Sequence, residues 1–234
     1  WLVLDLTGSG TAIGLVVALQ TLPVLFLGPL GGLLADRVDK RRLLLVTQTL
    51  AAVLAVLLGA LVLANVVRLW MVCVLAAGLG FVNLIDGPTR LSFVGEMVGP
   101  RDLTNAVSLN SVLVNLARAL GPAAAGVLIV TVGVGWCFLI NAASFLASIT
   151  ALALMRPAEL LRSTPQPRRR GQLRDGFRYV RGTPRILIPL LMMAVVGTLA
   201  YEFQVSLPLL ARYTLGGAAG TYGTMTALMG AGAV

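Results

Sequence analysis

Two apolar runs, each long enough to cross a lipid bilayer, flank a short and densely charged turn near the start of the chain. The runs cover residues 11–34 and 43–64, and the turn at 35–42 reads ADRVDKRR. A helix needs about 20 apolar residues to cross the hydrocarbon core of a membrane. Charged side chains collect in the turns outside that core. The pattern therefore predicts that the chain crosses a membrane, makes a basic turn and crosses back.

The composition extends this prediction to the whole chain. Of its 234 residues, 58% are hydrophobic and 12% are charged, whereas soluble domains carry about 25% charged residues. In lipid every backbone N–H and C=O group must be bonded within the protein, which helices and closed barrels achieve. The apolar runs are too long, and alternate too little, for barrel strands. We expect an all-α polytopic membrane protein.

Breaks between the apolar runs predict the order of the spans. We expect the end of a first, incomplete span at 1–5, spans at 11–35, 43–64, 69–88, 105–131, 135–155 and 185–210, and the start of another at 218–234. This divides the chain into an N-terminal transmembrane bundle (1–155), a cytoplasmic central loop (156–184) and the truncated start of a C-terminal transmembrane bundle (185–234).

Lysine and arginine are distributed unequally between the two sides of these spans. Arg68 and Arg212 lie on one side, Arg118 lies within a span, and the rest of the 18 basic residues lie on the other side. Basic loops stay in the cytoplasm, so the second side is predicted to be cytoplasmic, in a multi-pass protein of the cell (inner) membrane. Topology accounts for the net charge of +9. We therefore expect membrane lipid, and no nucleic acid, as a partner.

The central loop contains a segment typical of an amphipathic helix. At 172–182, helical periodicity puts three apolar residues on one side and three basic residues on the other: Leu173, Phe177 and Val180 against Arg174, Arg178 and Arg181. One interpretation is a helix lying at the cytoplasmic surface near anionic lipid. The other is a plain linker that its charges hold inside the cell. The sequence favours the two equally.

The charged turn resembles the loop between the second and third spans of the major facilitator superfamily of secondary transporters. The family pattern G-x-L-a-D-r-x-G-r-K/R is matched by Gly32, Leu34, Ala35, Asp36, Arg37, Lys40 and Arg41. Asp39 replaces the usual glycine, as in exporter-like branches. The resemblance implies a major facilitator fold, with a six-helix N-terminal bundle and the start of a C-terminal bundle. It also implies conformational gating by Gly32, Asp36, Arg37 and Arg41, with Asp36 as a latch between bundles. The alternative is a charge cluster that only sets topology.

A second motif at 118–126 resembles the fifth-span pattern G-P-x-x-G/A-G of antiporters. Gly121, Pro122 and Gly126 match it. Proline removes a backbone donor and bends a helix, and the family uses this bend as a gating seal. The alternative is an ordinary packing kink. Over essentially its whole length, the chain resembles the enterobactin-exporter and macrolide-efflux-like branch of the superfamily.

Ionisable and amide side chains within spans are the candidates for coupling and substrate contact, because such groups are costly in lipid. A carboxyl group in a low-dielectric cavity can bind and release a proton near neutral pH. The candidates for proton coupling are Glu202 and Arg118; those for substrate binding or the cavity are Asn110, Asn115, Tyr201 and Gln204. Asp86 and Arg90, four residues apart, are expected to form a structural pair. Many drug–proton antiporters have an arginine where this chain has Val74, which argues against coupling at that position.

These features favour a secondary transporter that exports a lipophilic or amphipathic small molecule, such as a drug or siderophore. It would be proton-coupled and work by alternating access of two bundles. The alternative is a non-transporting membrane scaffold or assembly subunit. The chain has no histidine and no G-x-x-x-x-G-K-S/T loop. We expect no enzyme activity, no metal and no cofactor.

Overall fold

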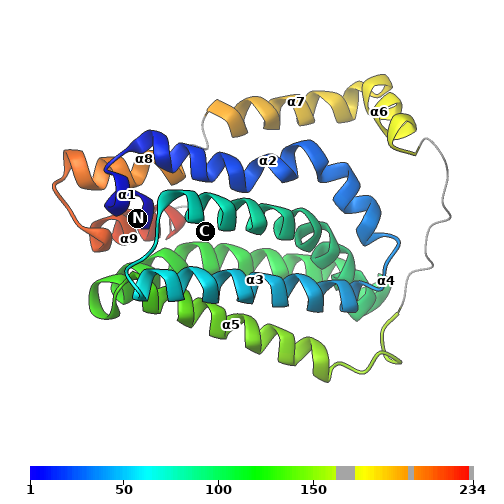
Figure 1. Ribbon diagram of the computed structural model, residues 1–234. Coiled ribbons are helices and arrows are strands. Elements are labelled where there is room, and N and C mark those ends of the chain that lie inside the picture. The colour runs from blue at the N-terminus through cyan, green and yellow to red at the C-terminus, as the bar shows by residue number, and fades with distance from the viewer. Residues whose placement is uncertain (162–171, 200–202, 232–234) are drawn as a thin grey trace.

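The computed structural model describes residues 1–161, 172–199 and 203–231, and all regular structure in these ranges is helical. The elements are α1 (Leu2–Thr7), α2 (Gly10–Ala35), α3 (Lys40–Leu63), α4 (Leu69–Val132), α5 (Val134–Leu154), α6 (Gln172–Gly182), α7 (Pro184–Leu199), α8 (Phe203–Leu209), the π-helix η1 (Leu210–Thr214) and α9 (Ala219–Ala231). Figure 1 shows α2 to α5 running side by side, with α8, η1 and α9 at one end. The predicted all-α class is confirmed.

Helix α4 differs from the prediction of a span that ends near Pro88. The helix continues through Pro88 and breaks at Gly99, whose φ of 75° and ψ of 178° are not helical. Glycine adopts this conformation without a steric penalty, and Pro100 follows it directly. The break divides α4 into two arms, 69–98 and 100–132. Each arm is long enough to cross a bilayer, so α4 supplies the two spans expected there, with a later turn between them.

The remaining predicted spans agree with the structure within a few residues, with one exception. Four helices are long and apolar enough to cross a membrane: α2, α3, α4 and α5. The predicted span 185–210 is the exception, because it corresponds to two helices, α7 and α8. Residues 200–202 between them lie outside the described part of the chain. The predicted helix at 172–182 is confirmed as α6.

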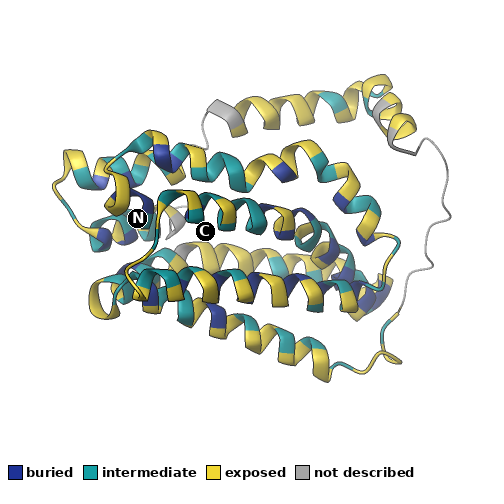
Figure 2. Ribbon diagram, in the orientation of Figure 1, coloured by how far each residue is buried: buried dark blue, intermediate teal, exposed yellow. Residues whose placement is uncertain are grey.

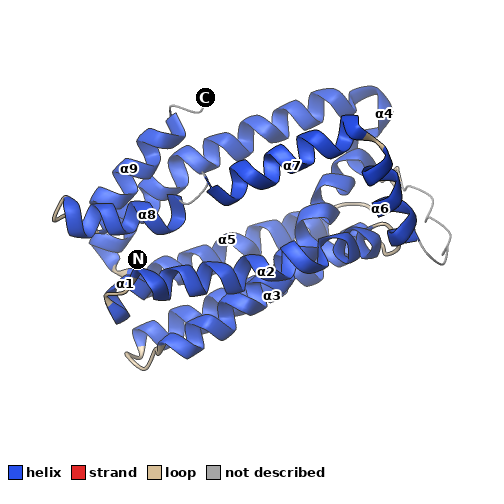
Figure 3. Cartoon of the chain, turned by 90° about the horizontal axis from the view of Figure 1, so that it is seen from above, coloured by secondary structure: helices blue, strands red, loops and turns tan. Residues whose placement is uncertain are grey.

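Close packing of the long helices depends on glycines at their crossings. A Cβ atom added at Gly31 would overlap the backbone oxygen of Leu84, so α2 and the first arm of α4 approach closely there. At Gly59, on α3, an added Cβ would lie 2.9 Å from Leu139 Cδ2, on α5. Such small residues allow membrane helices to pack backbone against backbone. Figure 3 shows the resulting layered arrangement from above.

The distribution of polar and apolar side chains is inverted relative to a soluble protein. The exposed fractions of Leu25 and Phe26 are 72% and 74%, whereas Lys40, Gln48 and Glu96 are buried between helices. Figure 2 shows exposed residues along the outward surfaces of the long helices. Lipid is a good solvent for such apolar surfaces and a poor one for unpaired charge. The arrangement is that of a multi-pass membrane protein.

Candidate functional site

The α2–α3 turn defines one end of the molecule, which we call the basic end. Asp39 precedes α3, and its Oδ1 accepts a hydrogen bond from the backbone N–H of Arg42 at 3.0 Å. A carboxylate at this position satisfies one of the free donors of the first helical turn and interacts favourably with the helix dipole. The aspartate that departs from the family pattern therefore caps α3.

A buried ion pair joins α3 to the first arm of α4 at the basic end. Lys40 Nζ lies 2.6 Å from Glu96 Oε1, and the two side chains are only 8% and 9% exposed. The Glu96 carbonyl oxygen also accepts a hydrogen bond from the Leu161 N–H at 2.9 Å, which fixes the chain just after α5 beside the α4 break. Glu96 is not among the residues predicted from the sequence. The only local indication of it is an acidic residue near the end of a long apolar segment.

Arg41 ties the same turn to α5. Its Nε donates to the Leu152 carbonyl at 2.7 Å and its Nη2 to the Ala153 carbonyl at 2.9 Å. These carbonyls belong to the last turn of α5, where backbone acceptors lack helical partners and the dipole favours a cation. One guanidinium group thus caps α5 and holds it against α3.

Asp86, on the first arm of α4, completes what we call the basic-end cluster: Asp39, Lys40, Arg41, Asp86 and Glu96. The predicted pairing of Asp86 with Arg90 is confirmed, with Nη2 and Oδ2 2.8 Å apart. Asp86 Oδ1 also accepts hydrogen bonds from Thr47 Oγ1 at 2.7 Å and Gln48 Nε2 at 2.8 Å, both on α3. The partners named here lie on α3, α4 or α5 or just after α5, so these contacts hold the three helices together.

The motif residues of the turn occupy different environments. Asp36 is exposed, and its carboxylate makes no hydrogen bond or ion pair within the described ranges. Arg37 is partly buried. At Gly32 an added Cβ would meet nothing within 4 Å, so the close approach to α4 belongs to the neighbouring Gly31. Asp36 is thus accessible to a partner outside the described helices.

The opposite end of α2 lies about 39 Å away, at 1.5 Å per residue, and carries contacts of a different kind. Arg212 Nη1 lies 2.8 Å from Asp5 Oδ1, with the two side chains 37% and 46% exposed. Tyr213 donates its hydroxyl to the Gly8 carbonyl at 2.6 Å. We call these two contacts, with the packing of Leu209 on Gly10, the far-end clamp.

Local backbone geometry sets up the far-end clamp. Gly8 has a φ of 62°, a left-handed conformation that ends α1 and turns the chain into α2. On the other side, η1 is a π-helix that follows Pro208 and carries both Arg212 and Tyr213. An added Cβ at Gly10 would lie 2.8 Å from Leu209 Cδ1, so the two segments meet at close range. Single-turn π-helices within α-helical segments occur frequently at functional sites.

A third contact joins the second arm of α4 to α9. A Cβ added at Gly126 would lie 3.1 Å from Gly223 Cα, and one added at Gly223 would lie 2.9 Å from the Pro122 oxygen. At Gly121 an added Cβ would meet nothing within 4 Å. Of the glycines in this motif, Gly126 therefore makes the close helix crossing and Gly121 does not.

The predicted coupling and substrate residues are dispersed. Arg118 and Asn115 are exposed on the second arm of α4, Asn110 is half-buried there, and Gln204 is exposed on α8. Tyr201 and Glu202 lie outside the described residues. The described four are accessible to a ligand, and the structure does not gather them into one pocket.

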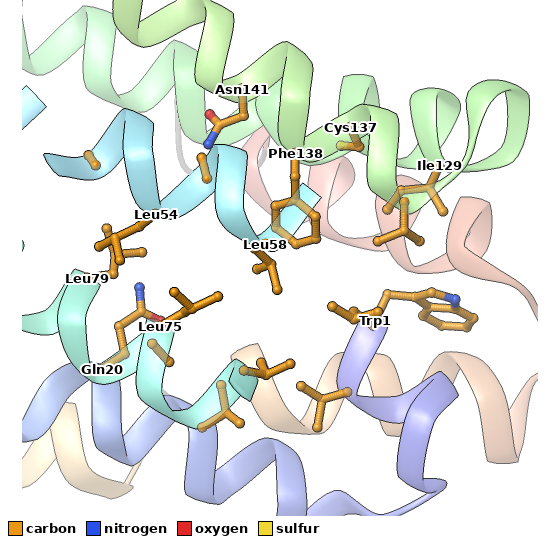
Figure 4. A pocket seen from close by; sticks show the side chains of 18 of the residues that line it. Trp1, Gln20, Leu54, Leu58, Leu75, Leu79, Ile129, Cys137, Phe138 and Asn141 are labelled. Carbon is orange, nitrogen blue, oxygen red and sulfur yellow. The ribbon is translucent and has the colours of Figure 1, made fainter. Parts of the chain in front are cut away.

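A cavity of about 440 Å³ lies within α1 to α5, and none of the predicted site residues lines it. Figure 4 shows apolar side chains such as Leu58, Leu75 and Phe138 around it, with Gln20 and Asn141 as polar exceptions. Its volume is within the range of ligand pockets. An apolar group with one or two hydrogen-bonding atoms matches this lining.

The helices, their exposed apolar surfaces and the charged α2–α3 turn define a polytopic membrane protein. The family described as "Transmembrane secretion effector" (MFS_3) matches residues 1–234, and the chain belongs to this family of major facilitator transporters. No solved structure matches the chain.

Curated relatives agree with this class. The chain is 29% identical to the "Uncharacterized MFS-type transporter YfiS" of Bacillus subtilis over 82% of its own length and 46% of the relative's. It is 30% identical to the "Multidrug efflux pump Tap" of Mycolicibacterium fortuitum, over 67% and 39%. It is 29% identical to the "Enterobactin exporter EntS" of Escherichia coli O1:K1, over 77% and 43%. The chain thus spans less than half the length of these relatives.

Proposed function

We propose that the chain forms the first bundle, and the start of the second, of a secondary exporter for lipophilic or amphipathic small molecules. Family membership supports transport, because the matched relatives are transporters, including proteins named as an enterobactin exporter and a multidrug efflux pump. Drugs and siderophores are accordingly the substrate classes to test first. Membrane lipid is the solvent in which the protein works.

The far-end clamp is the observation that carries the proposed mechanism. It joins residues 207 positions apart in the chain, Asp5 before α2 and Arg212 on η1. The predicted boundary at 184/185 puts these residues in different bundles. The positive-inside distribution puts the clamp on the outer side of the membrane. An exporter that works by alternating access must separate its bundles there to release substrate. The clamp is then an outer gate in its closed state.

The basic-end cluster is proposed to keep the helices of the first bundle together while the outer gate opens and closes. The contacts named above lie within the first bundle, so rocking of one bundle against the other leaves those contacts intact. Asp36, exposed beside this cluster, is then a latch for a partner on the second bundle. Gly126 and Pro122, at the crossing with α9, belong to the surface along which the bundles move. The 440 Å³ cavity lies within one bundle, so rocking does not expose it alternately to the two sides.

The outer gate can be tested by cross-linking the full-length protein. After Cys73 and Cys137 are replaced by alanine, we introduce Gly10→Cys with Leu209→Cys, since an added Cβ at Gly10 lies 3.6 Å from Leu209 Cγ. Oxidation should form a disulfide and abolish efflux of a dye in proteoliposomes, and reduction should restore it. Efflux that continues with the disulfide formed would refute the gate.

A matched pair within the first bundle provides the control. In Gly59→Cys with Leu139→Cys, the corresponding Cβ–Cγ distance is 3.1 Å, between α3 and α5. This pair should also form a disulfide, but it joins helices that we expect to move together. Oxidation should therefore leave efflux nearly unchanged. If both disulfides abolish efflux, the bundle itself must deform during transport.

Proton coupling is proposed to involve Glu202, with Arg118 as a charged partner. A carboxyl group within a span exchanges protons with the two sides in turn as the cavity changes access. Glu202→Gln should remove the dependence of efflux on an imposed pH gradient while the protein still binds substrate. Retention of the pH-gradient dependence would place the proton on another residue. Glu159→Gln, an exposed acid paired with Arg156, is the control and should leave that dependence unchanged.

A further inference from the structure

Helix α6 carries three arginines whose side chains have no partner among the described residues. Arg174, Arg178 and Arg181 recur at four- and three-residue spacing, which places them on one face of the helix. All three are exposed, and none makes an ion pair or hydrogen bond within the described ranges. Basic-end residues such as Lys40 and Arg41 have partners on neighbouring helices. Within the described ranges, the three guanidinium groups of α6 thus form an exposed row that no other side chain pairs with.

The direction of α6 is the second observation. The axes of 174–182 and the following helix segment, 184–197, make an angle of 98°. Figures 1 and 3 both show α7 running in the general direction of α2, with α6 across that direction at the end where α4 bends. Since α2 is apolar and long enough to cross a membrane, a helix that runs across the direction of α2 has the orientation expected of one in the plane of the membrane surface. Its end of the molecule is the basic end, which faces the cytoplasm by the positive-inside rule.

The chemistry of α6 matches that location. In the sequence of α6, the residue before each arginine is apolar: Leu173, Phe177 and Val180. Interfacial helices have this composition: an apolar face enters the acyl boundary while basic side chains lie at the headgroups. Guanidinium groups bind phosphate through paired, charge-assisted hydrogen bonds. Asp175 is the one acid in the helix.

We propose that α6 docks on anionic phospholipid headgroups of the cytoplasmic leaflet through Arg174, Arg178 and Arg181. This assigns the central loop a lipid-binding surface and selects the first of the two interpretations that the sequence left open. The proposal is independent of the transport mechanism, because it depends on the direction and charge of α6 alone. Docking would hold the connection between the two bundles at the membrane surface.

Hydrogen exchange of the full-length protein in lipid nanodiscs tests the proposal. One set of discs contains phosphatidylcholine only. The other also contains roughly 30% of the anionic lipid phosphatidylglycerol, which gives the membrane an appreciable negative surface potential. Amides of 172–182 should exchange at least about fivefold more slowly in the anionic discs, the ratio equivalent to the roughly 1 kcal/mol that one basic residue contributes. Salt at about 0.5 M shortens the Debye length to roughly a few ångströms and should reduce the difference in exchange rate between the two lipids.

Three variants decide what causes any protection. R174Q/R178Q/R181Q should exchange at the same rate in both lipids, and R174K/R178K/R181K should retain most of the difference because it keeps the charge. R42Q/R101Q/R156Q removes three exposed arginines from the basic end outside α6 and should behave as the parent. Equal exchange in the two lipids for the parent protein would overturn the proposal. A lipid dependence that survives in R174Q/R178Q/R181Q would also overturn it. So would protection of 172–182 that appears only when a soluble acidic protein is added.

Discussion

The two ends of the bundle use the same kinds of polar contact in opposite ways. At the basic end, Lys40 and Glu96 are 8% and 9% exposed, and their pair joins neighbouring helices of one bundle. At the far end, Arg212 and Asp5 are 37% and 46% exposed and join segments 207 residues apart. A buried pair is costly to break, because separation leaves an unpaired charge, whereas water solvates the partners of an exposed pair. We therefore expect the buried pair at the basic end to persist and the exposed pair at the far end to break more readily.

The largest expected effect comes from breaking the buried pair. Glu96→Ala removes the carboxylate that lies 2.6 Å from the buried Lys40 ammonium group, and removing one partner of a buried pair costs about 3–5 kcal/mol. Thermal unfolding of the purified protein in detergent should show a correspondingly large loss of stability. The double variant K40M/E96M should recover most of the lost stability, since neutral side chains of similar volume remove both buried charges. A double variant as unstable as Glu96→Ala would mean that the charges themselves are needed.

The helix crossing between α4 and α9 should respond less strongly, because it depends on packing without charge. Gly126→Ala places a Cβ 3.1 Å from Gly223 Cα, and overpacking of this kind costs about 1–3 kcal/mol. Gly121→Ala is the matched control: nothing lies within 4 Å of the added Cβ, so the change should be neutral or gain up to about 1 kcal/mol of helix propensity. Both can be measured as shifts of the unfolding midpoint. Equal effects of the two substitutions would contradict the close crossing at Gly126.

The smallest effect on stability is expected at the far end, with the clearest effect on conformation. Arg212→Ala removes an exposed ion pair, which contributes about 0–1 kcal/mol, so the unfolding midpoint should barely move. The clamp should nevertheless open more often, because Asp5 loses its partner. A single cysteine at Leu209, which packs on Gly10, should then react faster with a water-soluble maleimide added from outside. An unchanged labelling rate would show that the ion pair does not control access.

Much of the fold could be predicted because each span satisfies its own backbone hydrogen bonds. Apolar length alone located α2, α3 and α5 within a few residues. It misplaced the end of the span at Pro88, since proline within a membrane helix is tolerated where neighbouring helices compensate for the lost donor. The turn came at Gly99, where the left-handed φ of 75° marks the break. Composition does not distinguish such a glycine from one that only packs.

The site was harder to predict, because its contacts join residues that are remote in sequence. Asp86 with Arg90 was found, since the two are one helical turn apart. Arg212 was predicted to lie on the non-cytoplasmic side of the membrane, but nothing in the local sequence of Arg212 or Asp5 indicates that they meet. Glu96 was missed for the same reason: its partner Lys40 is 56 residues away.

The sequence by itself determined the solvent, the number of crossings as far as residue 155 and the basic side, because hydrophobicity and charge act on each segment separately. Tertiary structure alone decided which charges pair, which of two nearby glycines makes each close crossing, and that α6 lies across the spans. These outcomes depend on distances between helices, and a difference of a few ångströms separates a buried ion pair from an isolated charge. The distance between two helices cannot be predicted from the local sequence of either one.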